Sequence, residues 1–454
     1  MTRNTSPDSL KLTEPGLLIC TLTIALAGLL FGFDTAVISG TTELLRQEFA
    51  LTPEWMGVTV SSALFGTLAG ALCAGRPGDR YGSRNALRVL AILYIISSVG
   101  SAFAWDWNSL VFFRVLGGLA VGASSALAPV YISEVAPTQH RGRLVAAFQF
   151  CVISGILLAY VSNAIIAGMN LSNSDEWRWK FGIATVPSIV FMVLLLRIPN
   201  SPRWLIAKGR VDEARAAFAF IGLTKPAAEA EIADVRADTG DGGDTERLSW
   251  ARYRKPILLA LLVAAFNQLS GINAMLYYLN DIFAASGGNL SPDTQAIVIG
   301  IVNLIFTGVG LMLIDRLGRR TLLLIGSAGM TVALVVAGFA MGGILPPWTL
   351  LAALIVFIIF FAPSSGAVIW VYISEVFPTQ VRSRGGAIGA SSHWGFNAVI
   401  ALIFPSVVAM SQSVPFYFFA AMMALQFIVV LAYFPETKGV PLERMRERLG
   451  LGKG

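Results

Sequence analysis

The motif YISEVAPTQHRGR at residues 131–143 returns as YISEVFPTQVRSR at residues 372–384, with ten of the thirteen positions identical. A second pair of motifs, GDRYGSR at 78–84 and IDRLGRR at 314–320, is separated by nearly the same distance, about half of the 454-residue chain. Internal repeats of this kind build many helical membrane folds, in which a site lies between the two halves near the bilayer midplane. The sequence therefore predicts two related halves.

Long apolar blocks surround these motifs. Hydrophobic residues make up 55% of the chain and charged residues 13%, and the mean hydropathy is +0.69. Soluble domains carry about 25% charged residues, whereas a helix needs about 20 mostly apolar residues in a row to cross a bilayer. We therefore predict an all-α membrane protein with twelve transmembrane helices in two six-helix halves. The expected helices lie near Leu17–Ser39, Glu54–Gly75, Ala86–Trp105, Leu110–Ser133, Leu144–Ala167, Trp179–Ile198, Pro256–Phe283, Gln295–Ile314, Thr321–Gly343, Thr349–Ser374, Gly385–Met410 and Pro415–Phe434.

Polar segments flank and separate the two halves. The linker sequence VDEARAAFAFIG at 211–222 has apolar residues at helical spacing and predicts short amphipathic helices. The stretch ADTGDGGD at 237–244 lacks this period and predicts a flexible link. The expected divisions are an N-terminal segment 1–16, a first half 17–198, a linker 199–254, a second half 255–434 and a tail 435–454.

The net charge of +6 is unevenly distributed. Arginines concentrate in loops on the side expected to hold both termini, and the opposite loops hold few basic residues, chiefly Arg46, Arg178 and Lys180. This positive-inside pattern predicts a multi-pass protein of the cell (inner or plasma) membrane with both termini in the cytoplasm. We expect no nucleic-acid partner, because the sequence contains no basic soluble domain.

The sequence lacks the residue patterns of common catalytic sites. It has two histidines, His140 and His393, and shows neither a Ser/His/Asp set nor a phosphate-binding loop. The cysteines Cys20, Cys73 and Cys151 fall in apolar blocks and have neither disulfide nor metal-ligand spacing. We therefore expect a protein that is not an enzyme and that needs no metal or cofactor.

The repeated motifs place acidic and basic residues at corresponding helix ends in both halves. Because an unpaired charge near lipid is costly, we expect two clusters of ion pairs, which would favour the state in which this face is closed. The alternative is that the arginines only anchor the loops on the positive side. The residues are Asp79, Arg80, Arg84, Glu134, Arg141 and Arg143 in the first half, and Asp315, Arg316, Arg319, Arg320, Glu375, Arg382 and Arg384 in the second.

One acid and one base lie inside apolar blocks. Asp34 is near the outer end of the first expected helix and Arg114 near the outer start of the fourth, so at ~1.5 Å per residue they lie at similar depth. A carboxylate that pairs with arginine in one state and loses water in another binds its proton with different affinities in the two states. The pair therefore predicts a proton-coupling site, and the alternative is a permanent ion pair between two helices.

Amides and aromatic rings also lie deep inside the apolar blocks, where each polar group needs a partner. Amides donate and accept hydrogen bonds and aromatic faces stack on C–H surfaces, so the set suits a sugar. For any single amide the alternative is an interhelical hydrogen bond, worth ~0.6 kcal/mol on average. Gly271 predicts a local break in the helix between two of the amides. The candidates are Phe31, Gln149, Asn267, Gln268, Asn273, Tyr277, Asn303, Gly366, Trp370, His393, Trp394 and Asn397.

Nine short motifs occur in the order typical of one transporter family. They are FGFDTAVISG (31–40), GDRYGSR, RVLGGLAVG (114–122), YISEVAPTQHRGR, PNSPRWL (199–205), NQLSGINAMLYY (267–278), DRLGRRT (315–321), YISEVFPTQVRSR and PETKG (435–439). Over nearly its whole length the chain resembles the sugar porters of the major facilitator superfamily, including bacterial sugar–proton symporters and the facilitative glucose transporters. The resemblance implies alternating access, a central monosaccharide site and a monomer in the lipid bilayer.

The resemblance also implies roles for single residues. Proton symporters of the family carry Asp at the position of Asp34, and passive facilitators commonly carry a neutral residue, so we expect import of a monosaccharide together with a proton. A helix-six glutamate known from xylose–proton symport is replaced here by Ala184, which excludes a relay through that residue. The implied sugar contacts are Gln149, Gln268, Asn273, Asn303, Trp370 and Trp394, with Phe31 stacking from the first helix.

Three departures from the family pattern leave the specificity open. Asn267 stands where glutamine is usual, Ala367 where a proline is common and His393 where Asn or Gln is common. Hexoses and pentoses differ by a group that a pocket discriminates by only ~1–3 kcal/mol, so the sequence does not name the sugar. A proton-independent facilitator, a sugar sensor and a multidrug exporter are the alternatives. Asp34 argues against the first, and the amides favour sugars over drugs.

Overall fold

We describe the protein from a computed structural model, which describes residues 14–136, 141–240, 248–288, 290–378, 381–440 and 449. Every regular element within these residues is a helix, and twelve helices are long and apolar enough to cross a membrane. This confirms the predicted all-α fold class. The spans are Pro15–Gly40, Pro53–Cys73, Ser83–Ala102, Trp107–Val135, Leu144–Ala167, Asn173–Arg197, Trp250–Tyr277, Pro292–Leu317, Arg319–Met341, Trp348–Val376, Arg384–Met410 and Val414–Tyr433.

The largest differences from the expected bounds are at the starts of the sixth and seventh spans and at the end of the seventh, which lies at Tyr277 rather than Phe283. The sixth span begins at Asn173 rather than Trp179, and the seventh at Trp250 rather than Pro256. Both starts are polar and follow a serine whose side chain accepts a hydrogen bond from the first turn. Capping of this kind stabilises a helix start without any apolar residue, so the apolar pattern alone does not find it.

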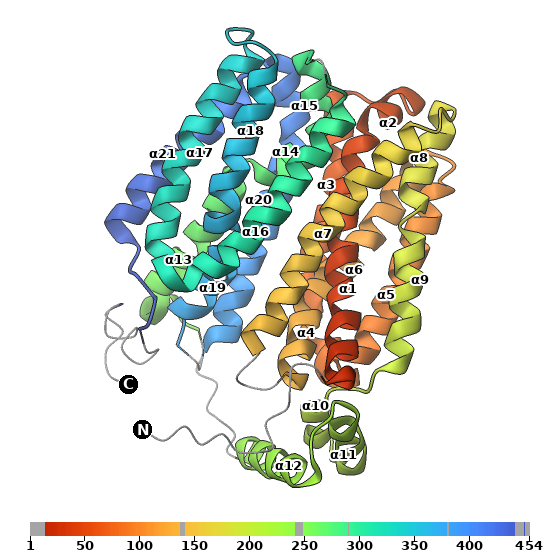
Figure 1. Cartoon of the computed structure of the whole chain (residues 1–454), viewed down its shortest axis with the longest axis vertical. Helices are drawn as coiled ribbons and strands as arrows, with labels where there is room; N and C mark the ends of the chain where they lie inside the picture. Colours follow the sequence, from red (N-terminus) through yellow and green to blue (C-terminus); the bar gives the residue numbers. More distant parts are fainter. Residues whose placement is uncertain are drawn as a thin grey trace.

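Two groups of helices stand side by side in Figure 1. The first half contains α1 (Pro15–Val37), η1 (Ile38–Gly40), α2 (Thr42–Glu48), α3 (Pro53–Cys73), α4 (Gly75–Tyr81), α5 (Ser83–Ala102), α6 (Trp107–Val135), α7 (Arg141–Ala167), α8 (Asn173–Gly182) and α9 (Thr185–Arg197). The second half contains α13 (Trp250–Leu269), α14 (Ile272–Tyr277), α15 (Leu279–Ser286), α16 (Pro292–Leu317), α17 (Arg319–Met341), α18 (Trp348–Phe361), η2 (Ala362–Gly366), α19 (Ala367–Val376), α20 (Arg382–Met410) and α21 (Val414–Tyr433). The halves meet where α3 packs on α20 and α7 on α16.

The linker folds into the short amphipathic helices that its sequence predicts. They are α10 (Pro202–Ala207), α11 (Val211–Phe220) and α12 (Lys225–Gly240), and they lie beyond one end of the first half (Figure 1). We call this the linker end of the bundle and the opposite one the far end. Because α12 continues to Gly240, residues 237–240 are helical rather than a link, and residues 241–244 lie outside the described part. The expected tail is described only for residues 435–440 and 449.

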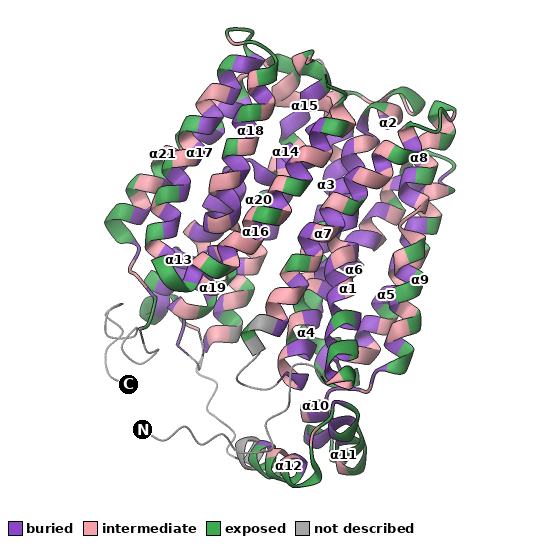
Figure 2. Ribbon diagram, viewed as in Figure 1, coloured by how far each residue is buried: buried purple, intermediate pink, exposed green. Residues whose placement is uncertain are grey.

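Small residues allow the helices of the first half to approach closely. A Cβ atom built on Gly118 of α6 would lie 1.9 Å from the carbonyl oxygen of Ala63 on α3, and one on Gly32 of α1 would lie 1.8 Å from that of Val152 on α7. Only a residue without a side chain fits such contacts, which are typical of helix packing in lipid. Exposed residues lie on the outside of both halves (Figure 2) and include Leu72, Met312 and Val332. This apolar exterior is what a lipid-facing surface requires.

Two spans of the second half are interrupted at the depth of the polar residues. Between α13 and α14, Gly271 has a φ of +81°, and a Cβ atom there would lie 2.3 Å from the ring of Phe419. Between α18 and α19, the wider turn η2 contains Pro363, which cannot donate a backbone hydrogen bond. The expected break at Gly271 is therefore present, and it separates Gln268 from Asn273.

Candidate functional site

The centre of the first half holds one buried ion pair. Nη1 of Arg114, on α6, lies 2.5 Å from Oδ1 of Asp34, on α1. The Arg114 side chain is 4% exposed and that of Asp34 is 23% exposed. The guanidinium carbon also lies 5.3 Å from the ring centroid of Phe181 on α8. The structure thus brings together the two residues predicted to couple a proton, and leaves the acid the more accessible of the two.

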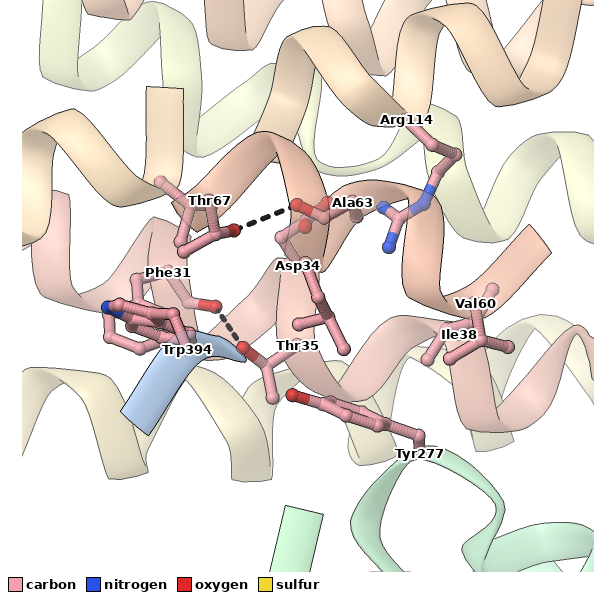
Figure 3. Close-up of a pocket in the computed structure, with 12 residues that line it drawn as sticks. Phe31, Asp34, Thr35, Ile38, Val60, Ala63, Thr67, Arg114, Tyr277 and Trp394 are labelled. Carbon is pink, nitrogen blue, oxygen red and sulfur yellow. Dashed lines mark hydrogen bonds and ion pairs between the residues drawn. The ribbon is translucent and has the colours of Figure 1, made fainter. Parts of the chain in front are cut away.

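Two small cavities share this ion pair in their walls. The first, of about 10 Å³, is also lined by Phe31, Tyr277 and Trp394, and we call it the aromatic cavity (Figure 3). The second, of about 20 Å³, is lined by a different set of residues, most of them from α5, α8 and α9. Asp34 and Arg114 therefore lie between residues of the predicted sugar site and a separate cavity within the first half.

Buried amides of α13 and α14 form a hydrogen-bonded network across the break at Gly271. Nδ2 of Asn267 donates to the carbonyl oxygen of Ser365 in η2 at 2.9 Å. The amide nitrogen of Gln268 lies 3.0 Å from Oδ1 of Asn267 and 3.1 Å from Nδ1 of His393 on α20. Oε1 of Gln268 accepts from Nδ2 of Asn273 at 3.0 Å. Gln268 thus joins three of the predicted sugar residues, and we call these four side chains the amide network.

Aromatic rings connect the amide network to the aromatic cavity. The ring of His393 lies 5.0 Å from the rings of both Trp370 and Trp394. Trp394 in turn lies 5.5 Å from Phe31, across the two halves. Such rings offer apolar faces beside polar amides, which is the combination that binds a sugar ring.

Other predicted contacts lie around this centre. The Tyr277 hydroxyl and the side-chain amide of Asn397 are hydrogen bonded, with Nδ2 of Asn397 2.9 Å from the hydroxyl oxygen. Trp370 is 41% exposed and Gly366 lies half-buried at the end of η2. Asn303, on α16, is buried and accepts from the Thr307 hydroxyl of its own helix at 3.5 Å. Gln149 is half-buried on α7, outside the hydrogen bonds of the amide network.

At the linker end, the second half builds a compact charge cluster. The guanidinium of Arg319 lies 2.9 Å from Glu375 and 3.2 Å from Asp315. Glu436 accepts from the backbone N–H groups of Arg319 and Arg320, and the Thr437 hydroxyl donates to Glu375 at 2.6 Å. Glu436 and Thr437 were not among the predicted cluster residues, although they lie in the family motif PETKG, which could have indicated them.

The remaining linker-end charges make different contacts. Arg84 donates to the carbonyl oxygen of Ile198 at 2.9 Å, and Oε2 of Glu134 is buried without a hydrogen-bond partner among the described residues. The first half therefore lacks a counterpart of the Arg319–Glu375 pair among the described residues, because Ser83 stands at the position of Arg319 in the repeated motif and Arg84 at that of Arg320. Four of the other predicted cluster residues are exposed: Asp79, Arg80, Arg316 and Arg384. Arg320 donates to the carbonyl oxygen of Leu431, and Arg382 is half-buried. The side chains of Arg141 and Arg143 lie outside the described part.

The far end carries a contact between the halves that the sequence did not predict. Asp281, on α15, accepts from the Thr42 hydroxyl on α2 at 2.8 Å and lies 3.7 Å from Arg46. We call these three residues the far-end latch. Nearby, the Tyr160 hydroxyl of α7 donates to the carbonyl oxygen of Leu276 on α14 at 3.2 Å. These bonds hold the far ends of the two halves together.

Lowering the pH from 7 to 5 is expected to favour closure of the far-end latch. Asp281 lies beyond the seventh span, and burial raises the pKa of its carboxyl to about 6, although Thr42 and Arg46 lower it and Glu43 raises it. If the far end opens, water reaches the carboxylate and its pKa falls toward the usual ~3.9. The state with the higher pKa gains stability as protons bind, so closure should become about tenfold more favourable over this range.

Spin labels on cysteines introduced at Glu48 and Ala285, exposed residues of opposite halves, can measure this closure by their distance distribution. The Asp281→Asn variant, which cannot titrate, should lose the pH response. A response of the same size in this variant would show that another group is responsible.

Comparisons with known proteins agree with this geometry. The family model "Sugar (and other) transporter" matches residues 20–449. The arabinose–proton symporter of Bacillus subtilis is 34% identical over 93% of this chain and 92% of its own length, and the D-xylose–proton symporter of Escherichia coli is 32% identical over 94% of each. The inward-open structure of the E. coli xylose transporter XylE covers 95% of this chain and 99% of its own, at 31% identity and a TM-score of 0.86. The structure of the same symporter bound to 6-bromo-6-deoxy-D-glucose gives a TM-score of 0.78.

Twelve spans in two related halves, with polar residues gathered between them, define a transporter of the major facilitator type. The chain belongs to the sugar transporter family. The resemblance drawn from the nine motifs is thereby confirmed, and the protein is a multi-pass membrane transporter rather than an enzyme.

Proposed function

We propose that this protein imports a monosaccharide together with a proton by alternating access. The observation that carries the proposal is that Asp34 and Arg114 line the same cavity as Phe31, Tyr277 and Trp394. A proton on Asp34 changes the charge in the wall of the proposed sugar site, so the occupancy of one site can alter the affinity of the other. The similarity to an arabinose–proton symporter and a D-xylose–proton symporter supports proton symport with a sugar as the cargo.

Sugar recognition would rest on the amide network and the rings around it. Gln268 and Asn273 lie on either side of the break at Gly271. Because no continuous helix joins them, both side chains can face the same ligand. Amides donate and accept, which matches sugar hydroxyls, and Trp394 offers a face for the C–H surface. We propose these side chains as the centre of the site, with Trp370, His393, Phe31, Asn397 and Tyr277 around it and Gln149 and Asn303 contributing from α7 and α16.

The orientation follows from the charges. The linker end carries the repeated arginine motifs, so we propose that it faces the cytoplasm, with both termini on that side. The far-end latch would then close the outer side, in agreement with the higher TM-score against the inward-open relative than against the sugar-bound one. The Arg319–Glu375 cluster would act as a cytoplasmic gating element by joining α17 to α19.

Uptake of radiolabelled xylose, arabinose and glucose into proteoliposomes tests the proposal. An inward proton gradient should drive at least one sugar above equilibrium, and a protonophore should collapse the accumulation. Equilibration that ignores the gradient would identify a facilitator in which the Asp34–Arg114 pair is only structural. Failure to move any sugar of a broader hexose and pentose panel would contradict the substrate class.

A further inference from the structure

The second cavity beside the ion pair is lined by hydroxyl groups. Tyr94, Ser97, Ser98 and Ser101 come from α5, and Ser188 comes from α9. Asp34 and Arg114 complete its polar wall, and the other lining residues are apolar. We call it the serine cavity. Its volume of about 20 Å³ exceeds the roughly 10–15 Å³ that one water molecule needs.

The serine cavity borders an unsatisfied donor. Nε of Arg114 is buried and has no hydrogen-bond partner among the described residues, although Nη1 donates to Asp34. A buried N–H of a charged group without a partner is costly, so native proteins normally supply one, from protein or from ordered water. The arginine, which lines the serine cavity, therefore has one donor that Asp34 does not satisfy.

Two hydroxyl groups of the cavity, those of Ser97 and Ser188, are available as acceptors. The Ser97 hydroxyl donates to the carbonyl oxygen of Phe113 at 2.8 Å, and the Ser188 hydroxyl donates to that of Ala184 at 2.7 Å. Because each hydroxyl proton is used, the oxygen lone pairs are what these serines offer to a cation or to water. A Cβ atom built on Gly117 would lie 2.4 Å from the Ser97 oxygen and 3.9 Å from Oδ1 of Asp34, so the serine and the acid flank the same point.

We propose that the serine cavity holds an ordered water and stabilises the Arg114 guanidinium when Asp34 takes up its proton. Protonation removes the negative charge that now balances the arginine. A buried arginine stays charged, because the guanidinium group is not deprotonated in proteins, and so it needs other acceptors at that moment. The serine oxygens and the water supply them, and the ring of Phe181 adds a cation–π contact.

This inference rests on the proposed proton symport and deepens it. Proton coupling makes two demands on this site. Arg114 must stay in place when Asp34 is neutral, and the ion pair must not be so stable that Asp34 never takes up a proton. The titratable groups that line the two cavities with Asp34 are Arg114, Tyr94 and Tyr277. The residues that α3, α8, α9 and α20 contribute are all uncharged, and Thr67 and Ser188 are the hydroxyl residues among them. Among the described residues, no second carboxylate therefore lines either cavity. The serine cavity is therefore the part of these walls that can accept hydrogen bonds from the arginine once Asp34 is neutral.

A matched pair of variants tests the serine cavity. Ser188→Val removes the acceptor oxygen and fills part of the cavity. Ser188→Thr introduces a side chain of almost the same volume as valine but keeps the hydroxyl. Infrared difference spectra of the whole protein in liposomes report the protonation of Asp34 as a carboxyl band that Asp34→Asn abolishes. Without the cavity the neutral acid is disfavoured relative to the ion pair. The midpoint of the band should therefore shift to lower pH in the valine variant. A shift to about tenfold higher proton concentration is expected, because this is the effect of losing one hydrogen bond to a charged group.

The threonine variant fills the cavity as much as valine but keeps the acceptor oxygen, so its midpoint should lie closer to the native one than that of the valine variant. Ala184→Val, which fills the same cavity without removing a hydroxyl, should shift the midpoint in the same direction and serves if Ser188→Val fails to fold. An unchanged midpoint in the valine variants, or a shift to higher pH, would overturn the role of the cavity. The infrared titration does not depend on transport, so the two proposals can fail separately. A native protein that fails to accumulate sugar contradicts the proposed symport, and the infrared midpoints still test the role of the serine cavity.

Discussion

Asp34→Asn is expected to abolish proton-driven sugar accumulation and to preserve sugar exchange across the membrane. Asparagine has the shape of aspartate and can accept from Arg114, so the contact between α1 and α6 survives, but its amide takes up no proton. A driving force of 100 mV is worth ~2.3 kcal/mol for each proton, which corresponds to a native accumulation ratio of about 50. In the variant this ratio should fall to about one.

Proteoliposomes measure both properties with the same labelled sugar. Gradient-driven uptake reports coupling, and exchange of internal unlabelled sugar for external label reports the alternating-access cycle without net proton flow. Asp212→Asn is a matched control, because Asp212 lies on the linker helix α11 with a side chain that is 96% exposed. Retained accumulation in Asp34→Asn would mean that another group carries the proton. Loss of exchange as well would mean that the ion pair mainly holds the helices together.

The ion pair could be predicted from the sequence because charge inside an apolar block is rare. Asp34 and Arg114 are isolated charges in long apolar segments, so helix direction and depth alone bring them together. The twelve spans follow from the same contrast between apolar and polar residues. The break at Gly271 could be predicted as well, since glycine between two amides marks a position where the helix does not need to continue.

The serine cavity and the far-end latch could not be predicted in this way. Serines are common in transmembrane helices, where they bond to their own backbone, so Ser97 and Ser188 do not stand out until α5 and α9 are placed beside Asp34. Asp281 lies just beyond the seventh span and resembles any polar residue at a helix end. Its contact with Thr42 depends on how the two halves are tilted against each other, which no local pattern contains.

The charge clusters show the limit of reasoning from repeats. The sequence suggests equal clusters in both halves, and Arg319 does reach Glu375. The described part of the first half has no such pair, because Ser83 stands at the position of Arg319 in the repeated motif. Arg84 corresponds to Arg320, and the two behave alike: each donates to a backbone carbonyl oxygen at the end of the last transmembrane helix of its half, that of Ile198 or Leu431. A single difference within the repeat, serine in place of arginine, therefore removes this interhelical ion pair from the first half.

Gln268→Leu is expected to weaken monosaccharide binding by about 10–100-fold while the protein still folds. Gln268 is 1% exposed and contacts Asn267, Asn273 and His393. Leucine fills a similar volume and provides no hydrogen bond, so these partners lose their orientation toward the sugar. Each unsatisfied buried group costs ~1–3 kcal/mol, which accounts for the expected loss.

Gln426→Leu provides the control for this change. Gln426 is also 1% exposed and lies in the second half, but it contacts Ser365 from α21, outside the amide network. Quenching of tryptophan fluorescence by bound sugar, together with thermal unfolding, separates affinity from stability in both variants. If both lose stability equally and neither loses affinity, the amides hold the helices together and the sugar binds elsewhere. If only Gln268→Leu loses affinity, the break at Gly271 is explained as well, because it is what lets Gln268 and Asn273 face the same ligand.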